Sequence, residues 1–205
     1  IQSERAEYQD FAILYRTNAQ SRALEEALRR RNLPYMIYSG NSFFERAEVK
    51  DMMAYFKLVV NINDDESFKR IVNKPARGIG DTSLSALTAA ASNHKTSLFK
   101  AAFSEDLEQF GLKQAAIKKI REFCNMIGSL TLKANEMNAH DIAKKIADES
   151  GLYMFFKMDT SIEGQSRTAN VEELVDSIKL FIEEKHGEYI EELQAEGQLS
   201  DGVEL

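Results

Sequence analysis

The sequence holds a single cysteine among its 205 residues and contains no long apolar run. One thiol excludes a disulfide framework and a thiolate metal cluster. The apolar neighbours of Cys124, among them Phe123 and Ile127, predict a buried and inert thiol. No stretch approaches the roughly 20 apolar residues that a membrane-spanning helix needs, and the start of the chain lacks the basic and apolar pattern of a signal peptide. We therefore expect a soluble, cytoplasmic protein without a membrane partner.

The motifs of nucleotide and metal chemistry are also missing. No G-x-x-x-x-G-K-[ST] loop occurs, so the chain cannot hold ATP by the phosphate-cradling route. The histidines His94, His140 and His186 lie far apart and have no second ligand at metal-binding spacing. Acidic pairs such as Asp64-Asp65 and Glu172-Glu173 fall at expected helix starts or on polar helix faces, which favour carboxylates. We expect no catalytic residue and no metal site, and structural roles for these pairs.

The formal net charge of −7 is unevenly distributed along the chain. Residues 1–100 hold 15 Lys or Arg and 12 Asp or Glu, a balance of +3, whereas residues 101–205 hold 11 and 21, a balance of −10. An acidic surface repels a phosphate backbone. Any contact with nucleic acid is therefore expected in the first half.

The beginning of the sequence has an α/β pattern. Phe11–Arg16 is a short apolar run typical of a buried strand. Ser21–Asn32 places its apolar residues on one helical face and ends before Pro34. Tyr35–Tyr38 predicts a second strand, followed by a polar turn. A strand, a helix and a strand within about 40 residues form one crossover unit of a parallel sheet.

Beyond the turn at Gly40 the sequence predicts helices and loops. The composition, 43% apolar and 29% charged, provides enough apolar material for a core. We expect helices over residues 44–60, 64–72, 81–91, 112–134, 139–150 and 170–185, and a loop over 157–168. The predicted fold is a mainly α-helical domain preceded by a small α/β fragment. A chain that begins at Ile1 and ends at Leu205 without an obvious stop is further expected to be an excised segment.

One inter-helix segment, Asn73–Ser83, carries a physical mechanism for binding phosphate. Gly78 and Gly80 let backbone N–H groups approach a phosphate closely, and Ile79 between them is expected to anchor the turn in the core. The side chains that offer further donors are those of Lys74, Arg77, Thr82 and Ser83. The alternative interpretation is a tight turn between helices with ordinary capping.

A second candidate follows the first expected strand, because open α/β sheets bind ligands at the carboxyl ends of their strands. Arg16, Asn18 and Arg22 there are suitable donors to phosphate or sugar. The same residues also fit a polar helix cap. Phe43 and Phe44 fit either a platform for stacking bases or packing within the core.

Three blocks of the sequence resemble one family. Phe11–Glu26, Tyr38–Asp51 and Val72–Asp81, in this order and spacing, are similar to the UvrD/PcrA/Rep helicases of superfamily 1, and Asn170–Leu174 resembles a weaker element of that family. The resemblance implies two RecA-like motor domains, 1A and 2A, that bind ATP between them and move along single-stranded DNA from 3′ to 5′. A helical domain, 2B, interrupts 2A.

The resemblance also implies a division of the chain and a set of contacts. Residues 1–38 would be a fragment of domain 2A, and residues 39–205 a C-terminally truncated domain 2B that swings about a hinge near residues 38–42. Arg16 and Asn18 would touch single-stranded DNA. The turn from Arg77 to Gly80 would touch the duplex backbone ahead of the fork.

On this interpretation the parent protein is an ATP-dependent DNA helicase of repair or replication that uses ATP and Mg²⁺. This chain lacks the ATPase motifs, so it is expected to bind no cofactor and to be inactive alone. Its expected partners are single-stranded and duplex DNA at a junction, and repair or replication proteins. An alternative is a protein-interaction module without DNA contact, because residues 170–205 hold 11 acidic residues and only two basic ones, Lys179 and Lys185. Nuclease-linked helicase relatives are a third interpretation.

Overall fold

The computed structural model describes residues 7–16, 18–37 and 42–195. Within these ranges the chain forms α-helices and short 3-10 helices and no β-strand. The α-helices are α1 (Asn18–Arg30), α2 (Ala47–Val60), α3 (Asp65–Ile71), α4 (Asp81–His94), α5 (Leu98–Ala101), α6 (Gln114–Ala134), α7 (Ala139–Glu149), α8 (Leu152–Lys157) and α9 (Ile162–Ala195). The 3-10 helices are η1 (Tyr8–Asp10), η2 (Phe43–Glu45) and η3 (Leu107–Phe110).

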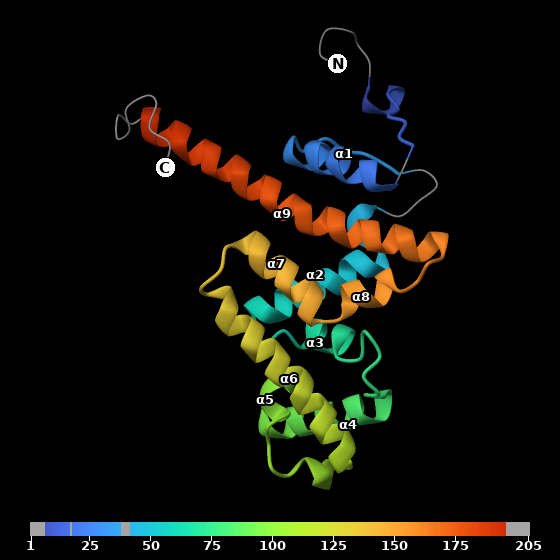
Figure 1. Ribbon diagram of the computed structural model, residues 1–205, viewed down its shortest axis with the longest axis vertical. Helices are drawn as coiled ribbons and strands as arrows, with labels where there is room; N and C mark the ends of the chain where they lie inside the picture. Colours follow the sequence, from blue (N-terminus) through green and yellow to red (C-terminus); the bar gives the residue numbers. More distant parts are fainter. Residues whose placement is uncertain (1–6, 17, 38–41, 196–205) are drawn as a thin grey trace.

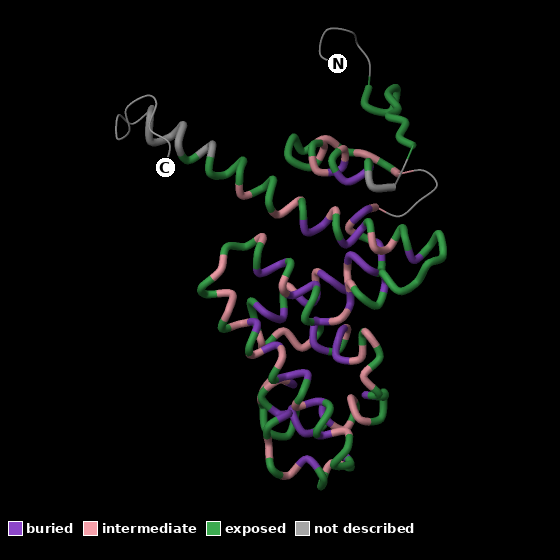
Figure 2. The backbone as a smooth tube through the Cα atoms, in the orientation of Figure 1, coloured by how far each residue is buried: buried purple, intermediate pink, exposed green. Residues whose placement is uncertain are grey.

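Helix α1 and most of the helical core lie on opposite sides of the long helix α9 (Figure 1). Its 34 residues correspond to a length of about 50 Å at 1.5 Å per residue. Helix α1 lies on one side of α9, and α2, α7 and α8 lie on the other. Helix α6 leads from this layer to a second group formed by α4 and α5. The buried residues run as a continuous core through both groups (Figure 2).

Helix α2 is the centre of the core because it is apolar around most of its circumference, the pattern of a helix buried on several sides. Val49, Met52, Tyr55 and Leu58 are completely buried, and α2 contacts α3, α6, α7 and α9. Its exposed residues are Ala47 at the start and Lys57 and Val60 near the end. The sequence predicted a helix over residues 44–60, and the structure confirms it from Ala47 onward.

Local capping chemistry sets several helix boundaries. Asp64 caps α3 by accepting a hydrogen bond from the Ser67 N–H at 3.0 Å, and this bond lowers the pKa of its carboxyl group. Its neighbour Asp65 accepts from the Leu98 N–H at 2.8 Å, at the start of α5. The acidic pair is therefore structural, as predicted. Gly151, which follows α7 with φ of +74°, adopts the left-handed conformation that favours glycine at a helix end.

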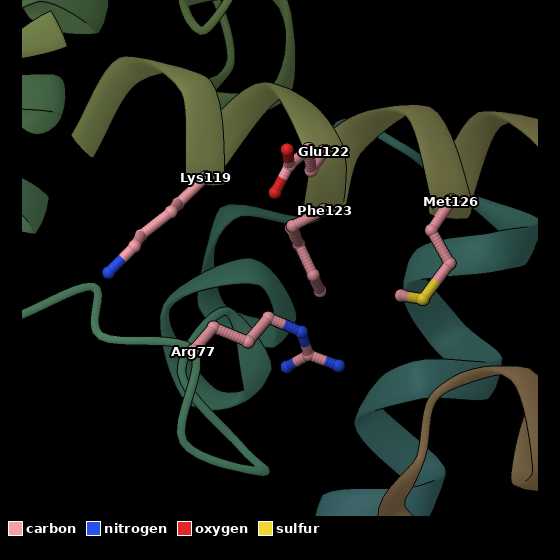
Figure 3. Close-up of a pocket in the computed structure, with 5 residues that line it drawn as sticks. All are labelled: Arg77, Lys119, Glu122, Phe123 and Met126. Carbon is pink, nitrogen blue, oxygen red and sulfur yellow. The ribbon is translucent and has the colours of Figure 1, made fainter. Parts of the chain in front are cut away.

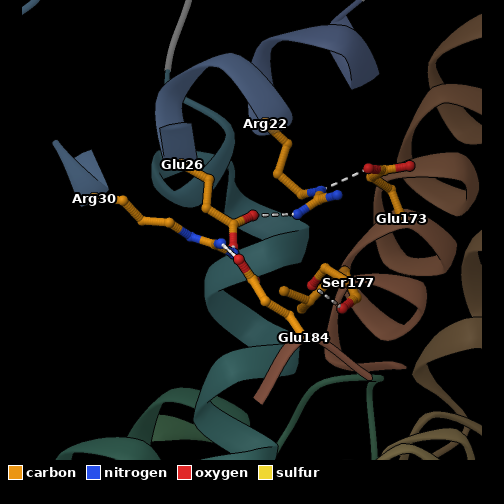
Figure 4. Close-up of polar contacts among 7 residues, drawn as sticks. Arg22, Glu26, Arg30, Glu173, Ser177 and Glu184 are labelled. Atoms are coloured by element: carbon orange, nitrogen blue, oxygen red, sulfur yellow. Dashed lines mark hydrogen bonds and ion pairs between the residues drawn. The ribbon is translucent and has the colours of Figure 1, made fainter. Parts of the chain in front are cut away.

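Helix α1 docks through polar rather than apolar contacts (Figure 4). Arg22, only 6% exposed, donates to Glu26 of its own helix and to Glu173 of α9. Arg30 forms a further ion pair with Glu184 of α9. Glu25, 2% exposed, accepts hydrogen bonds from the Phe43 N–H at 2.9 Å and from the Ser42 hydroxyl.

A buried polar network connects the same three segments beneath these ion pairs. Arg46 donates to the Asn170 side-chain oxygen at 2.8 Å and to the Ser21 hydroxyl at 3.1 Å. The Asn170 amide in turn donates to Glu48 at 2.6 Å. All four side chains are at least nine-tenths buried. Since buried polar groups need partners, these bonds fix α1, α2 and α9 in one arrangement.

The predicted α/β fragment is not confirmed. Phe11–Arg16 forms no strand, and its apolar side chains are exposed, with Leu14 94% exposed. Residues 33–37 also lack regular structure, while Tyr38 lies outside the described residues. A parallel strand needs a neighbouring strand for its hydrogen bonds, and no strand pairs with these segments in the described ranges. The helix between them is present as α1.

The structure differs from the sequence predictions in two places along the helical region. The stretch 157–168, predicted as a loop, contains the first turns of α9, which begins at Ile162. The short helices α5 and α8 were not predicted, because neither is long enough to show a helical period.

The predicted boundary and hinge near Gly40 fall at 38–41, outside the described residues. The division into two domains therefore remains a prediction.

Among the described residues, no helix is both long and apolar enough to cross a membrane. The same ranges contain no group of three His, Cys, Asp or Glu side chains arranged to hold a metal ion.

We predict that Glu25→Ala lowers the free energy of unfolding by about 2 kcal/mol, because the buried Phe43 N–H loses its acceptor. Urea denaturation and hydrogen exchange of the α1 amides measure this loss. Glu66→Ala is the control, since that carboxylate is 87% exposed and pairs only with Lys69, and should cost less than about 0.5 kcal/mol. Equal losses for the two variants would contradict the anchoring role of Glu25.

Cys124 is completely buried, and burial raises the pKa of its thiol to about 12. We predict that iodoacetamide does not label it in the folded protein at pH 8, because almost no thiolate is present and the sulfur is inaccessible. Labelling should be complete in denaturant, as followed by mass spectrometry. Rapid alkylation of the native protein would show that α6 opens in solution.

Candidate nucleic-acid interface

The segment between α3 and α4 folds into an ordered loop, residues 72–80, which we call the glycine loop. The Asn73 side-chain oxygen accepts hydrogen bonds from the backbone N–H groups of Arg77 at 2.7 Å and Ile79 at 3.1 Å. Ile79 is 3% exposed and packs into the core, as the sequence predicted. One amide side chain and one apolar side chain thus fix the path of the loop.

The Arg77 guanidinium group lies on the inner side of the glycine loop. Its Nη1 atom donates to the carbonyl oxygens of Ile71 at 3.2 Å, Val72 at 3.4 Å, Lys74 at 3.0 Å and Pro75 at 3.2 Å. Its Nη2 atom donates to the Tyr55 hydroxyl at 2.7 Å and to the Ser150 carbonyl at 2.8 Å. Because Ile71 ends α3 and Ser150 follows α7, this cation lies at the negative ends of two helix dipoles.

Aromatic rings enclose the same guanidinium group. Its central carbon lies 5.2 Å from the centre of the Phe123 ring, a cation–π distance. Burial raises the pKa of Tyr55 to about 12, so its hydroxyl stays protonated and donates to the Lys74 carbonyl at 2.5 Å. The sequence predicted Arg77 as a donor to phosphate, and this role stays a prediction. Its two terminal nitrogens, however, already donate within the chain.

The outer side of the loop presents backbone and little side chain. Gly78 and Gly80 are both exposed, and Gly78 has φ of +70°, a conformation that favours glycine. Gly80 is the N-cap of the 14-residue helix α4 and supplies no side-chain cap. The N–H groups of the first helical turn have no intrahelical acceptor, so they point outward with the positive end of the helix dipole. Thr82 in this turn is exposed and Ser83 is half-buried.

Two lysines lie at the glycine loop, one within it and one beside it. Lys74 is half-exposed and forms an ion pair at 3.2 Å with Asp51, whose carboxylate also lies 2.7 Å from Arg70. Lys119 comes from α6 and was not singled out in the sequence, because nothing in its local pattern places it beside a loop about 40 residues earlier. A side chain built on Gly78 would place its Cβ 2.5 Å from the Lys119 Nζ atom. The ammonium group therefore lies directly over the glycine.

A cavity of about 350 Å³ lies between the loop and α6 (Figure 3). Its lining residues are Arg77, Lys119, Glu122, Phe123 and Met126. Figure 3 shows Lys119 extending from α6 toward the loop, while the Arg77 guanidinium points away from it, under Phe123. The two cations are thus directed differently, one along the surface and one into the fold.

The second candidate site is only partly assembled. Arg16 is exposed, and its backbone N–H bonds to the Gln20 side chain at 2.9 Å. The Asn18 side chain lies outside the described residues. Arg22 is buried in its ion pairs with Glu26 and Glu173. Contact of these residues with DNA remains a prediction, and the structure gives Arg22 a role in docking α1 onto α9.

The aromatic pair at the start of the helical region packs inside the protein. Phe43 is completely buried and meets Phe44 edge to face, with ring centres 5.2 Å apart. The guanidinium groups of Arg46 and Arg29 lie over these two rings. Of the two interpretations offered by the sequence, core packing is the one that the structure shows.

The sequence of the chain matches a known protein family. The family model for the UvrD-like helicase C-terminal domain matches residues 1–203. This chain belongs to that family. It is 39% identical over 184 residues to DNA helicase II of Escherichia coli and 36% identical over 168 residues to the ATP-dependent DNA helicase PcrA of Staphylococcus aureus. DNA helicase II of Haemophilus influenzae is 39% identical over 186 residues.

These alignments cover 90%, 82% and 91% of this chain but only 25%, 23% and 25% of the respective relatives. The resemblance drawn from the sequence blocks is thus confirmed. The chain spans about a quarter of the length of these UvrD-like helicases.

We predict that Arg77→Ala lowers the free energy of unfolding by about 3 kcal/mol, because buried carbonyl groups at two helix ends lose a charged donor. Arg77→Lys should recover less than half of this loss, since an ammonium group cannot reach both sets of acceptors. Urea denaturation of both variants measures the effect.

Arg167→Ala is the control for this measurement, since that arginine is half-exposed on α9 and, among the described residues, forms its ion pair with Glu163 alone. It should cost less than about 0.5 kcal/mol. A loss at Arg77 no larger than the loss at Arg167 would show that the hydrogen bonds of Arg77 do not support the loop.

Proposed function

We propose that this chain is the part of an ATP-dependent DNA helicase that holds the duplex ahead of the fork. The glycine loop carries the proposal. It presents the backbone of the exposed residues Gly78 and Gly80 and the N–H groups at the start of α4, where no side chain supplies a cap. Such groups bind phosphate without reading bases, which suits a helicase that acts on any sequence.

The proposed activity of the parent protein is based on the family. Relatives of this chain are named as DNA helicases, one of them as ATP-dependent. We propose that the parent protein binds ATP and Mg²⁺ elsewhere, in motor domains that move from 3′ to 5′ along single-stranded DNA in repair or replication. The present chain contains no phosphate-cradling lysine loop, so it should hydrolyse no ATP alone. Arg16 and Asn18 are proposed contacts to the single strand.

The proposed duplex surface differs from the one inferred from the sequence. It includes the backbone of Gly78 and Gly80 and the hydroxyls of Thr82 and Ser83. Lys74 can join it only by exchanging its ion pair with Asp51 for a phosphate. Arg77 supports this surface from inside through its hydrogen bonds to carbonyl groups. We leave Arg22 out, because its ion pairs lie between α1 and α9.

A second candidate function is a protein-interaction module that regulates the motor. The later half of α9 favours it, because Leu180 and Phe181 are 57% and 50% exposed beside the exposed carboxylates of Glu183 and Glu184. An apolar strip bordered by acidic residues fits a partner protein better than DNA.

We predict that Gly80→Ala weakens binding of the intact helicase to forked DNA about tenfold, because a Cβ keeps the phosphate away from the backbone N–H groups. The variant should still fold: φ at Gly80 is −84°, and no atom lies within 4 Å of the new Cβ. Binding to single-stranded DNA should not change. Fluorescence anisotropy with labelled forked and single-stranded DNA, at low and moderate salt, measures both affinities.

Gly128→Ala is the matched control, since it adds the same methyl group within α6, where the new Cβ meets only Phe99 at 3.8 Å. Its affinity for forked DNA should equal that of the unmodified protein. If Gly80→Ala also binds forked DNA normally, the loop is not a DNA contact and the protein-interaction function is favoured.

A further inference from the structure

The position of Lys119 relative to Gly78 is determined by tertiary packing alone. Helix α6 passes the glycine loop and places the Lys119 ammonium 2.5 Å from where a side chain on Gly78 would begin. A residue with a Cβ at position 78 would force the lysine to move. The absent side chain therefore both permits the left-handed backbone and leaves room for a positive charge at the loop surface.

The charge of Lys119 is not used within the described part of the chain. Lys119 is exposed, and none of the ion pairs and hydrogen bonds formed by the described residues includes it. Glu122, one turn later on α6, lines the same cavity but forms no ion pair with it. The ammonium is thus available to an anion from solution.

The other two cationic side chains at the glycine loop already have partners within the chain. Arg77 donates to five carbonyl groups and to Tyr55, and Lys74 is paired with Asp51. Lys119 is therefore the cationic side chain at the loop that can bind a ligand without breaking a contact of the fold. It also lies on the exposed side of Gly78, where the proposed duplex contact is made.

We propose that Lys119 is a second contact to the duplex backbone, binding from α6 the phosphate that the glycine loop binds through its N–H groups. The inference rests on the proposed function and names a residue of the same surface. The ammonium supplies a point charge, and the loop supplies directed donors, so the two parts complement each other. Two carboxylates limit the site: Glu122 beside the cavity and the exposed Asp81 in the first turn of α4.

The test is the salt dependence of binding by the intact helicase. Replacing Lys119 with Gln removes one charge, so the slope of log affinity against log salt should become shallower by about 0.9 for forked DNA. The ratio of the affinities of the unmodified protein and the variant for forked DNA should then fall about 3.5-fold between about 50 and 200 mM salt. Binding to single-stranded DNA should keep its slope, and the melting temperature should not change, because Lys119 has no partner to lose.

Lys118→Gln is the matched control. It removes the same charge from the neighbouring exposed position, about 100° around the helix, and should leave the slope nearly unchanged. The double variant Gly80→Ala with Lys119→Gln should lose less affinity than the product of the single losses, because both changes affect one phosphate.

The outcomes separate this inference from the proposed function. If Gly80→Ala weakens forked-DNA binding but the Lys119 and Lys118 variants behave alike, the role of Lys119 is overturned and the loop contact stands. If Gly80→Ala has no effect, the loop contact fails and the inference falls with it. Two results together support both the loop contact and the role of Lys119. The slope becomes shallower for Lys119→Gln but not for Lys118→Gln, and the losses from Lys119→Gln and Gly80→Ala are less than multiplicative.

Discussion

The Arg77 guanidinium group is the interaction on which the rest of the surface depends. It collects carbonyl oxygens from the end of α3, from the glycine loop and from the residue that follows α7, and it lies against the ring of Phe123 in α6. A cation with a planar set of donors can satisfy several helix ends at once. Without it, the Ser150 carbonyl would lose its side-chain donor, while the Ile71 and Lys74 carbonyls would keep one donor each. The loop would also lose its link to the end of α7.

The same loop therefore has an inner and an outer side with different chemistry. Inside, Arg77 and the Asn73 amide use their hydrogen-bonding capacity on the protein backbone. Outside, the two glycines leave N–H groups uncovered, and Lys119 brings a charge from a distant part of the sequence. A rigid support behind an open backbone is what a phosphate contact requires, because binding then costs little further ordering.

Helix α1 is held differently from the helical core. Its contacts with α9 and η2 are ion pairs and hydrogen bonds, several of them buried, whereas α2 packs through apolar side chains. Polar interfaces depend on geometry and lose stability steeply when one partner is removed. The adjoining segment Phe11–Tyr15 keeps apolar side chains exposed. The buried apolar core contains no described residue of α1, so α1 is joined to it mainly through polar groups.

The sequence by itself determined the helices with a clear apolar period, the acidic start of a helix at Asp64, the burial of Cys124 and the family, because these depend on local patterns and short blocks. Only the tertiary structure decided which cations face inward and which face outward. Arg77 and Arg22 were sequence candidates for DNA contact, yet both are bound within the chain, while Lys119 carries no local signal. The strands expected at 11–16 and 35–38 are not found among the described residues. Strand pairing, like charge pairing, depends on neighbours that are distant in sequence.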